Sequence, residues 1–302
     1  MPELSEFTAF VSTKSGIKKP KLVEQDVLVH RVLKEIYSSP TFVENYLFKG
    51  GSCLVKCYFG YYRFSVDLDF TWRKQEVWEV GEKELRRKLL NEVKVFGRLL
   101  EETAKQTGIE FINEPKNRRY FEFGGGGRMS TFKMWKGTEL LKIQVNFLEA
   151  LLFPSKSLIA KTLLNGVTLS RDEKAYFSEF LDFYKPLKVN AYDEREILCE
   201  KVRAILTRKA QKLRDFYDIF ILDAHGFKVE QLTDGIISKI KASLYYEKYR
   251  NNLEANKKAL KYSTDILEDP FERELLVKNP QRNFEKFLAN LLDSLKDITN
   301  QV

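Results

Sequence analysis

The sequence predicts an α/β (α+β) chain in which a small mixed sheet with flanking helices comes first and a mostly helical region follows. Three observations support this. The chain has 302 residues, and 43% of its residues are hydrophobic, which suits two packed domains better than a disordered chain. The period-2 patterns of strands lie before about residue 150, and helical periodicity dominates after it. We therefore expect domains over residues 1–155 and 156–302.

The first half alternates helical and strand patterns. Residues 22–39 carry apolar side chains at helical spacing, and a long charged amphipathic helix is closed by Gly108 at the position that favours glycine. Alternating apolar and charged residues over 66–72 predict a strand. The predicted elements of this half are helices over 22–39, 53–59 and 78–107 and strands over 66–72, 119–123, 129–135 and 139–148.

The second half shows helical patterns only. Their apolar residues recur every three or four positions, which indicates helices with one buried face. No internal repeat or low-complexity segment interrupts them. The predicted helices span 193–210, 213–225, 229–246, 253–260 and 284–295.

Two patterns that suggest binding sites are better explained as structure. The run of glycines at 124–127 lacks the Gly-Lys-Ser/Thr of a phosphate loop and lies between two predicted strands, which predicts a hairpin turn. Cys53, Cys57 and Cys199 cannot form a disulfide framework or a four-ligand zinc site with only two histidines in the chain. We expect them to be buried thiols.

The chain is moderately basic. It holds 51 lysines and arginines against 43 acidic residues, for a formal net charge of +8. A positive balance favours phosphate-bearing partners, although surface ion pairs explain a similar content of charged residues. The start of the chain lacks the plan of a signal peptide, and no apolar run approaches the roughly 20 residues of a membrane span. We expect a cytoplasmic protein with no membrane partner.

Two acids carry the most specific chemical signal. In the sequence Ser65-Val-Asp-Leu-Asp-Phe70, Asp67 and Asp69 are two residues apart, so a strand would point both carboxylates to one face. Adjacent carboxylates repel unless a cation lies between them. Mg²⁺ or Mn²⁺ suits such oxygen ligands and keeps positions open for phosphate oxygens. An isolated Asp-x-Asp also occurs on solvated strands, so the neighbouring sequence must distinguish a metal site from a solvated strand face.

The context is a glycine turn upstream. Gly50-Gly51-Ser52 precedes a predicted short helix, where the backbone can approach a phosphate and amides and a hydroxyl can donate to it. Residues 49–58 and 63–70 together resemble the AbiEii/AbiGii-type nucleotidyltransferase toxins, with a Gly-Gly-Ser-x-Leu turn and an Arg-x-Ser-x-Asp-Leu-Asp-Phe strand. The resemblance implies a nucleotidyltransferase domain of the DNA polymerase β type.

A second block resembles the same family. It consists of Glu196-Ile-Leu-Cys-Glu-Lys201-Val-Arg-Ala204 on a helix, followed by Arg208 and by Arg214-Asp-Phe-Tyr-Asp218. Six basic residues and no acid lie between positions 201 and 214. Such a stretch favours a bound anion such as a triphosphate, while a solvated basic face is the alternative for Arg203, Lys209 and Lys212.

The resemblance implies roles for individual residues. Lys201 is expected to contact the triphosphate, and Asp215 to orient Lys201 or to act as a base. Asp218 is expected to pair with Arg214, and for Arg63 both phosphate binding and bracing of its loop stay open. The expected catalytic residues are Asp67, Asp69, Lys201 and Asp215, with Asp67 and Asp69 as metal ligands, and the expected nucleotide-binding residues are Gly50, Gly51, Ser52, Arg63, Ser65, Lys201 and Arg208.

One departure from the polymerase β pattern concerns a third carboxylate on a later strand. The alternate positions of the strand candidate at 139–148 hold Gln144 and Asn146, which are neutral. A two-metal site then lacks one ligand. The sequence leaves open whether one metal or two would bind.

These features predict a metal-dependent nucleotidyltransferase that moves a nucleoside monophosphate from an NTP to an acceptor. The expected acceptor is RNA, at the 3′ end of tRNA, and the expected role is the toxin of a toxin–antitoxin or phage-defence pair with a cognate antitoxin protein. The C-terminal domain is expected to complete the active site. Two alternatives stay open: transfer to a protein or a small molecule, and a nucleotide-binding module without catalysis.

Overall fold

The computed structural model describes residues 2–259, 267–280 and 283–302. The chain divides into two compact units. Unit 1 comprises Met1–Glu149 and Ser155–Ala191, and unit 2 comprises Ala150–Pro154 and Tyr192–Val302. The described part of the chain contains no helix with the length and apolar character needed to span a bilayer.

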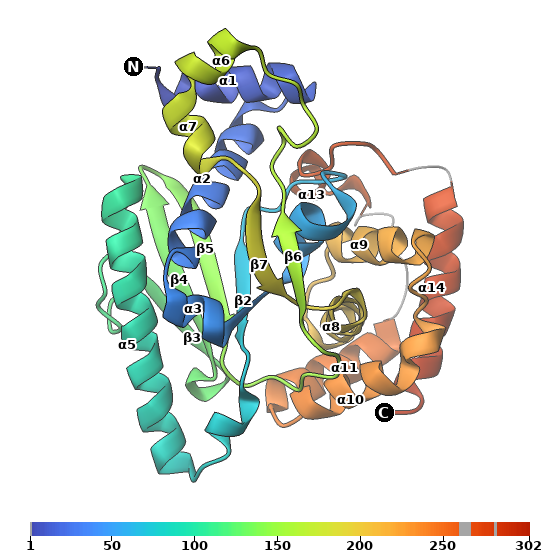
Figure 1. Ribbon diagram of the computed structural model, residues 1–302. Helices are drawn as coiled ribbons and strands as arrows, with labels where there is room; N and C mark the ends of the chain where they lie inside the picture. The colour runs from blue at the N-terminus through green and yellow to red at the C-terminus, as the bar shows by residue number, and fades with distance from the viewer. Residues whose placement is uncertain (1, 260–266, 281–282) are drawn as a thin grey trace. The chain divides into compact units, whose positions relative to one another are not determined.

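Unit 1 is built on a mixed seven-stranded sheet with the order β3-β4-β5-β2-β1-β7-β6 (Figure 1). The pairs β2–β5 and β1–β7 are parallel, and the remaining pairs are antiparallel. The sheet confirms the predicted α/β class. The strands are β1 Tyr46–Lys49, β2 Leu68–Trp72, β3 Phe121–Gly124, β4 Met129–Lys136, β5 Glu139–Asn146, β6 Lys156–Ala160 and β7 Leu187–Ala191.

The sheet explains why unit 1 extends past residue 155. Strand β7 lies parallel to β1, with Ala191 opposite Phe48, and β6 pairs antiparallel with β7. Residues 156–191, which the sequence analysis assigned to the C-terminal domain, therefore pack with the N-terminal unit. Backbone pairing across more than 130 residues is a non-local property that a change in local periodicity does not reveal.

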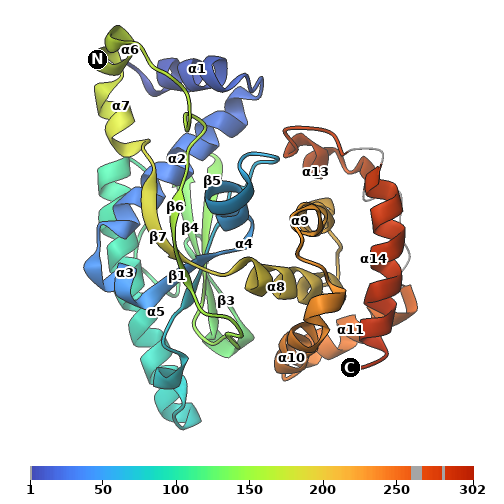
Figure 2. The ribbon, with the colours of Figure 1, turned by 45° about the vertical axis from the view of Figure 1, so that its right-hand side comes forward.

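Helices α2, α3 and α5 cover one face of this sheet (Figure 2). The apolar stripe of α2 is fully buried, and Gly108 ends α5 with a left-handed φ of 70°, as predicted. Helix α1, which the sequence analysis missed, is held by buried Phe7 and Val11. The helices of unit 1 are α1 Leu4–Ser15, α2 Pro20–Tyr37, α3 Pro40–Asn45, α4 Gly50–Cys53, α5 Glu82–Thr107, α6 Arg171–Tyr176 and α7 Ser178–Phe183, with a π-helix over Leu54–Phe59.

Unit 2 is helical, as predicted. Helix α8 lies at its centre and packs against α9, α10, α11 and α14, with Val202, Ile205 and Leu206 buried. The predicted helix over 253–260 begins earlier, at Glu247, and its last residue lies outside the described residues. The described helices are α8 Glu194–Thr207, α9 Leu213–Ala224, α10 Thr233–Ser243, α11 Glu247–Ala259, α13 Pro270–Glu274 and α14 Asn283–Thr299.

The three cysteines are buried thiols outside any disulfide bond, which confirms the sequence-based interpretation. The glycine run forms the predicted connection between β3 and β4, with a single 3-10 turn over Gly125–Gly127.

Candidate functional site

The glycine turn holds one of the two acids in place. Gly50 begins α4 with a φ of +73°, a conformation that disfavours any side chain. A Cβ at this position would lie 2.3 Å from Oδ2 of Asp69. Strand β1 also places Lys49 directly opposite Asp69 in the antiparallel register. The carboxylate therefore lies against the start of α4, where only glycine leaves room for it.

The second glycine makes room for two other predicted site residues. A Cβ on Gly51 would lie 2.2 Å from a guanidinium nitrogen of Arg63 and 3.2 Å from Oγ of Ser65. The Arg63 side chain is buried and donates to the carbonyl of Phe64 at 2.8 Å. This geometry favours the bracing role for Arg63, because the guanidinium fixes its own loop against the turn.

Ser52 connects the turn to the Asp-x-Asp segment. Its side chain is fully buried, and its hydroxyl donates to the backbone carbonyl of Asp67. The bond ties the start of α4 to the residue that precedes β2. Contact between this hydroxyl and a phosphate stays a prediction.

The donor set suits a hard divalent ion that shares its coordination with phosphate. Asp69 has its carboxylate at the glycine turn, and Asp67 lies two residues before it; Mg²⁺ is commonly held by one or two carboxylates together with substrate phosphates and waters. Across the described ranges, no group of three or more His, Cys, Asp or Glu side chains is arranged to hold a metal ion.

The strand candidate with the two neutral residues lies next to the Asp-x-Asp segment in the sheet, as β5 beside β2. Gln144 on β5 is paired with Asp69, and Asn146 is paired with Thr71. Both are neutral, as the sequence shows. The amide of Asn146 instead donates at 2.9 Å to the carboxylate of Glu149, which follows the end of β5.

Sequence reasoning missed the ion pair between Lys49 and Glu149. The ammonium of Lys49 lies 3.2 Å from Oε2 of Glu149, and the two side chains are 7% and 11% exposed. The signal was present in part, since Lys49 directly precedes Gly50 and shares a sheet face with Asp69. Its partner follows 100 residues later and only the fold reveals it.

A second cluster lies in unit 2 and centres on Lys201. Its ammonium lies 2.6 Å from Oδ1 of Asp215 and 2.7 Å from Oδ2 of Asp218. Arg208 binds the other oxygen of Asp215 at 2.9 Å. The structure therefore brings three predicted site residues together, with the Arg208 side chain 47% exposed while Asp215 is 4% exposed.

The charges of this cluster decide how Asp215 can act. Burial opposes its ionisation, but the cations of Lys201 and Arg208 outweigh burial and hold the pKa of Asp215 well below its usual range. A general base works best with a pKa near the operating pH. Both carboxylate oxygens are also engaged in salt bridges. The arrangement favours orientation of Lys201 and Arg208 over proton abstraction.

The pairing predicted for Asp218 and Arg214 needs correction. Asp218 binds Lys201, while Arg214 binds the carboxylate of Glu272 at 2.5 Å. Glu272 also accepts from the backbone N–H of Arg214 at 3.1 Å. Asp218 lies one turn after Arg214 on the same helix, which suggested that these two residues pair. Instead Glu272 of α13, 58 residues further along the chain, binds Arg214.

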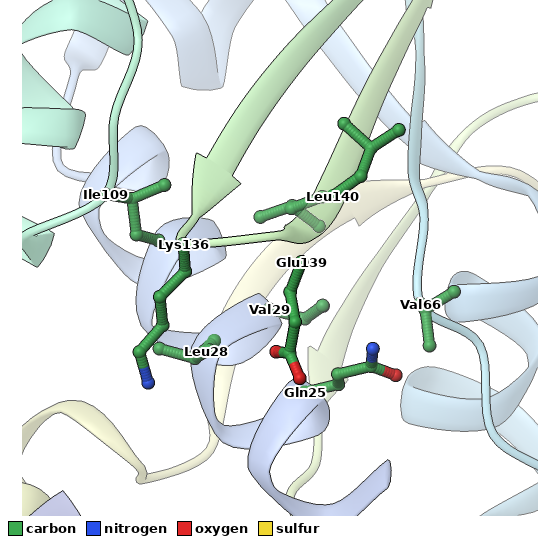
Figure 3. A pocket seen from close by; sticks show the side chains of 9 residues that line it. Gln25, Leu28, Val29, Val66, Ile109, Lys136, Glu139 and Leu140 are labelled. Atoms are coloured by element: carbon green, nitrogen blue, oxygen red, sulfur yellow. The ribbon is translucent and has the colours of Figure 1, made fainter. Parts of the chain in front are cut away.

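A small pocket elsewhere in unit 1 does not have the properties of a nucleotide site. It measures about 30 Å³, room for little more than one water molecule. Its lining is mostly aliphatic, with Leu28 and Val29 of α2 and Val66 among the lining residues, and it also includes Lys136 and Glu139 (Figure 3). Ligand pockets are roughly ten times larger.

Comparison with known proteins agrees with this geometry. The family described as nucleotidyl transferase AbiEii toxin, type IV toxin–antitoxin system, matches residues 31–300. No curated protein matches the chain. The match spans both the glycine turn with its Asp-x-Asp strand and the Lys201 cluster. The chain therefore belongs to the AbiEii family of nucleotidyltransferase toxins, which act in type IV toxin–antitoxin systems.

Proposed function

We propose that this protein is a metal-dependent nucleotidyltransferase that transfers a nucleoside monophosphate from an NTP to RNA, at the 3′ end of tRNA. The observation that carries the proposal is the Asp69 carboxylate, which fills the space beside Gly50 that a Cβ would take, in a segment that also holds Asp67. A binding-only site gains little from two carboxylates that repel each other.

The residues of unit 1 supply the ligands in this proposal. Asp67 and Asp69 would hold Mg²⁺ or Mn²⁺, which when bound polarises the phosphate and neutralises its charge. Gly50 and Gly51 shape the start of α4, and we expect its backbone amides to donate to a phosphate. Ser65, beside Gly51, is the hydroxyl of this group that we expect to contact substrate.

The residues of unit 2 support the nucleotide part of the proposal. Burial, followed by the nearby guanidinium groups of Arg214 and Arg208, lowers the pKa of Lys212. Cations crowded in this way repel one another, and a polyphosphate relieves the repulsion. We expect Lys201 and the half-exposed Arg208 to bind the triphosphate, and Asp215 to orient them.

The reaction conserves its atoms and charge in a simple way. A hydroxyl oxygen of the acceptor forms a bond to the α-phosphorus of the NTP, the bond from that phosphorus to the bridging oxygen breaks, and pyrophosphate leaves. The hydroxyl proton passes to water. The net charge of +8 favours a polyanionic acceptor, and we expect the cognate antitoxin to be a separate protein that opposes this activity.

The test is an incubation of the purified protein with Mg²⁺, total tRNA and each NTP labelled on its α-phosphate. We expect label in RNA with the wild type, and at most about a thousandth of it with Asp67→Ala or after chelation of the metal, because metal-assisted charge stabilisation supplies several kcal/mol. Glu139→Ala, at the pocket of Figure 3, is the matched acidic control and should keep full activity.

Other outcomes separate the alternatives. Label in protein bands or in a small molecule would change the acceptor and keep the enzyme class. NTP binding without any transfer would favour a nucleotide-binding module. Transfer by Asp67→Ala at the wild-type rate would refute the assignment of the site.

A further inference from the structure

The end of helix α8 has an unusual exit that its own sequence does not explain. Helices that stop sharply commonly place glycine in the left-handed conformation just after their last residue. Residues 208–213 contain neither glycine nor proline. Instead, Arg208 leaves the helix in an extended conformation with φ −92° and ψ 150°.

Two asparagines of α11 satisfy the carbonyls that this exit exposes. The last carbonyls of a helix lack partners within it. The amide of Asn256 donates to the carbonyl of Leu206 at 2.7 Å and to that of Arg208 at 2.9 Å, with the carbonyl of Ile205 at 3.4 Å. The amide of Asn252 donates to the carbonyl of Thr207 at 2.9 Å.

The helix that presents these amides is firmly anchored. Asn252 and Asn256 are four residues apart and share one face of α11, while Leu253 beside them is 2% exposed in the core of unit 2. Two amides on a packed helix therefore fix four consecutive carbonyls, from residue 205 to residue 208. We call Asn252 and Asn256 the amide clamp.

The clamp acts at the residue that reaches Asp215. With the Arg208 carbonyl held by Asn256, the Arg208 side chain extends to Oδ2 of Asp215 at 2.9 Å and stays 47% exposed. A free arginine loses conformational freedom when it binds a ligand, and a preoriented one loses less. The clamp thus prepares a guanidinium that still has surface free for an anion.

We propose that Asn252 and Asn256 are positioning residues for nucleotidyl transfer, which orient Arg208 toward the triphosphate of the NTP. The inference rests on the proposed function and extends it to the C-terminal region, whose role the sequence left open. Helix α11 then contributes to nucleotide affinity without touching the nucleotide.

The experiment is a double-mutant cycle read by calorimetric binding of each Mg²⁺–NTP to the full chain. Loss of a hydrogen bond to a charged group corresponds to about a tenfold change in affinity, so Arg208→Ala should weaken NTP binding about tenfold. Asn256→Ala should weaken it about three- to tenfold, because the guanidinium is retained and only its orientation is lost. In the Arg208→Ala background, Asn256→Ala should have no further effect, since coupled residues are not additive.

Controls separate positioning from general stability. Asn251→Ala, at an exposed position of the same helix, should bind NTP like the wild type. If Asn256→Ala does not fold, the same cycle is measured with Asn252→Ala, which removes only the hydrogen bond to the Thr207 carbonyl. Equal losses in both backgrounds, or no loss at all, would overturn the clamp, while label transferred to RNA by the wild type in the transfer assay would still uphold the proposed function. A wild-type protein that binds no NTP would overturn both.

Discussion

Replacement of Lys201 by methionine tests the charge balance of unit 2 most directly. Methionine has nearly the same length as lysine and removes only the ammonium, which lies 2.6 Å from Asp215 and 2.7 Å from Asp218. Those carboxylates are 4% and 0% exposed. The variant therefore keeps two buried acids but loses the cation that they share.

The magnitude follows from this burial. Breaking a buried ion pair by removal of one partner costs about 3–5 kcal/mol, because the other charge stays buried. Arg208 still binds Asp215 at 2.9 Å, which offsets part of the loss. We expect the free energy of unfolding to fall by about 3 kcal/mol at pH 7, at the lower end of that range.

The dependence on pH has a definite sign. In the wild type, the lowered pKa of Asp215 adds stability that is complete above the unfolded value near 3.9 and is lost only as pH falls below it. In Lys201→Met, the two neighbouring carboxylates raise the pKa of the pair. Protonation then relieves their repulsion, so the deficit relative to the wild type should shrink between pH 7 and pH 5.

The assay is urea unfolding followed by far-ultraviolet circular dichroism at pH 5, 6 and 7. Lys209→Met, at an exposed position near the end of α8, is the control and should stay within about 0.5 kcal/mol of the wild type. A deficit below about 1 kcal/mol at pH 7, or one that does not change with pH, would refute the view that Lys201 neutralises two buried acids.

Two further predictions concern unit 1. Gly50→Ala should reduce transfer at least about a hundredfold, measured with α-labelled NTP, because a Cβ 2.3 Å from Oδ2 of Asp69 displaces that carboxylate and the φ of +73° is strained. Gly60→Ala is the control, because Gly60 has the same φ and open space around it. Wild-type activity of Gly50→Ala would contradict the packing of Asp69 against Gly50. Burial, and then the charge of Lys56, lowers the pKa of His30 to about 3, so the folded protein should lose stability as pH falls below about 6.5. His30→Gln should flatten that loss between pH 6.5 and 4 in thermal unfolding, and an unchanged slope would show that other groups cause it.

Local chemistry made much of this protein predictable from its sequence. Strand periodicity, a glycine pair and the Asp-x-Asp spacing depend on contacts between residues close in the chain, so β2, the turn before α4 and the position of Asp69 follow from them. Lys201 and Arg208 both contact Asp215, but Arg208 lies beyond the end of α8 in an extended conformation, so helical spacing alone does not account for this cluster.

Other features follow only from the tertiary structure, because their partners are far apart in sequence. Because β7 pairs with β1, residues 156–191 belong to unit 1. Glu149 forms an ion pair with Lys49, 100 residues before it in the chain. Arg214 binds Glu272 and not Asp218, the partner expected from the sequence. Neither the amino-acid composition nor the periodicity of apolar residues identifies partners that are far apart in the chain. The sequence by itself determined the chemistry of the site, and the tertiary structure decided which charges neutralise one another and which helix fixes the orientation of Arg208.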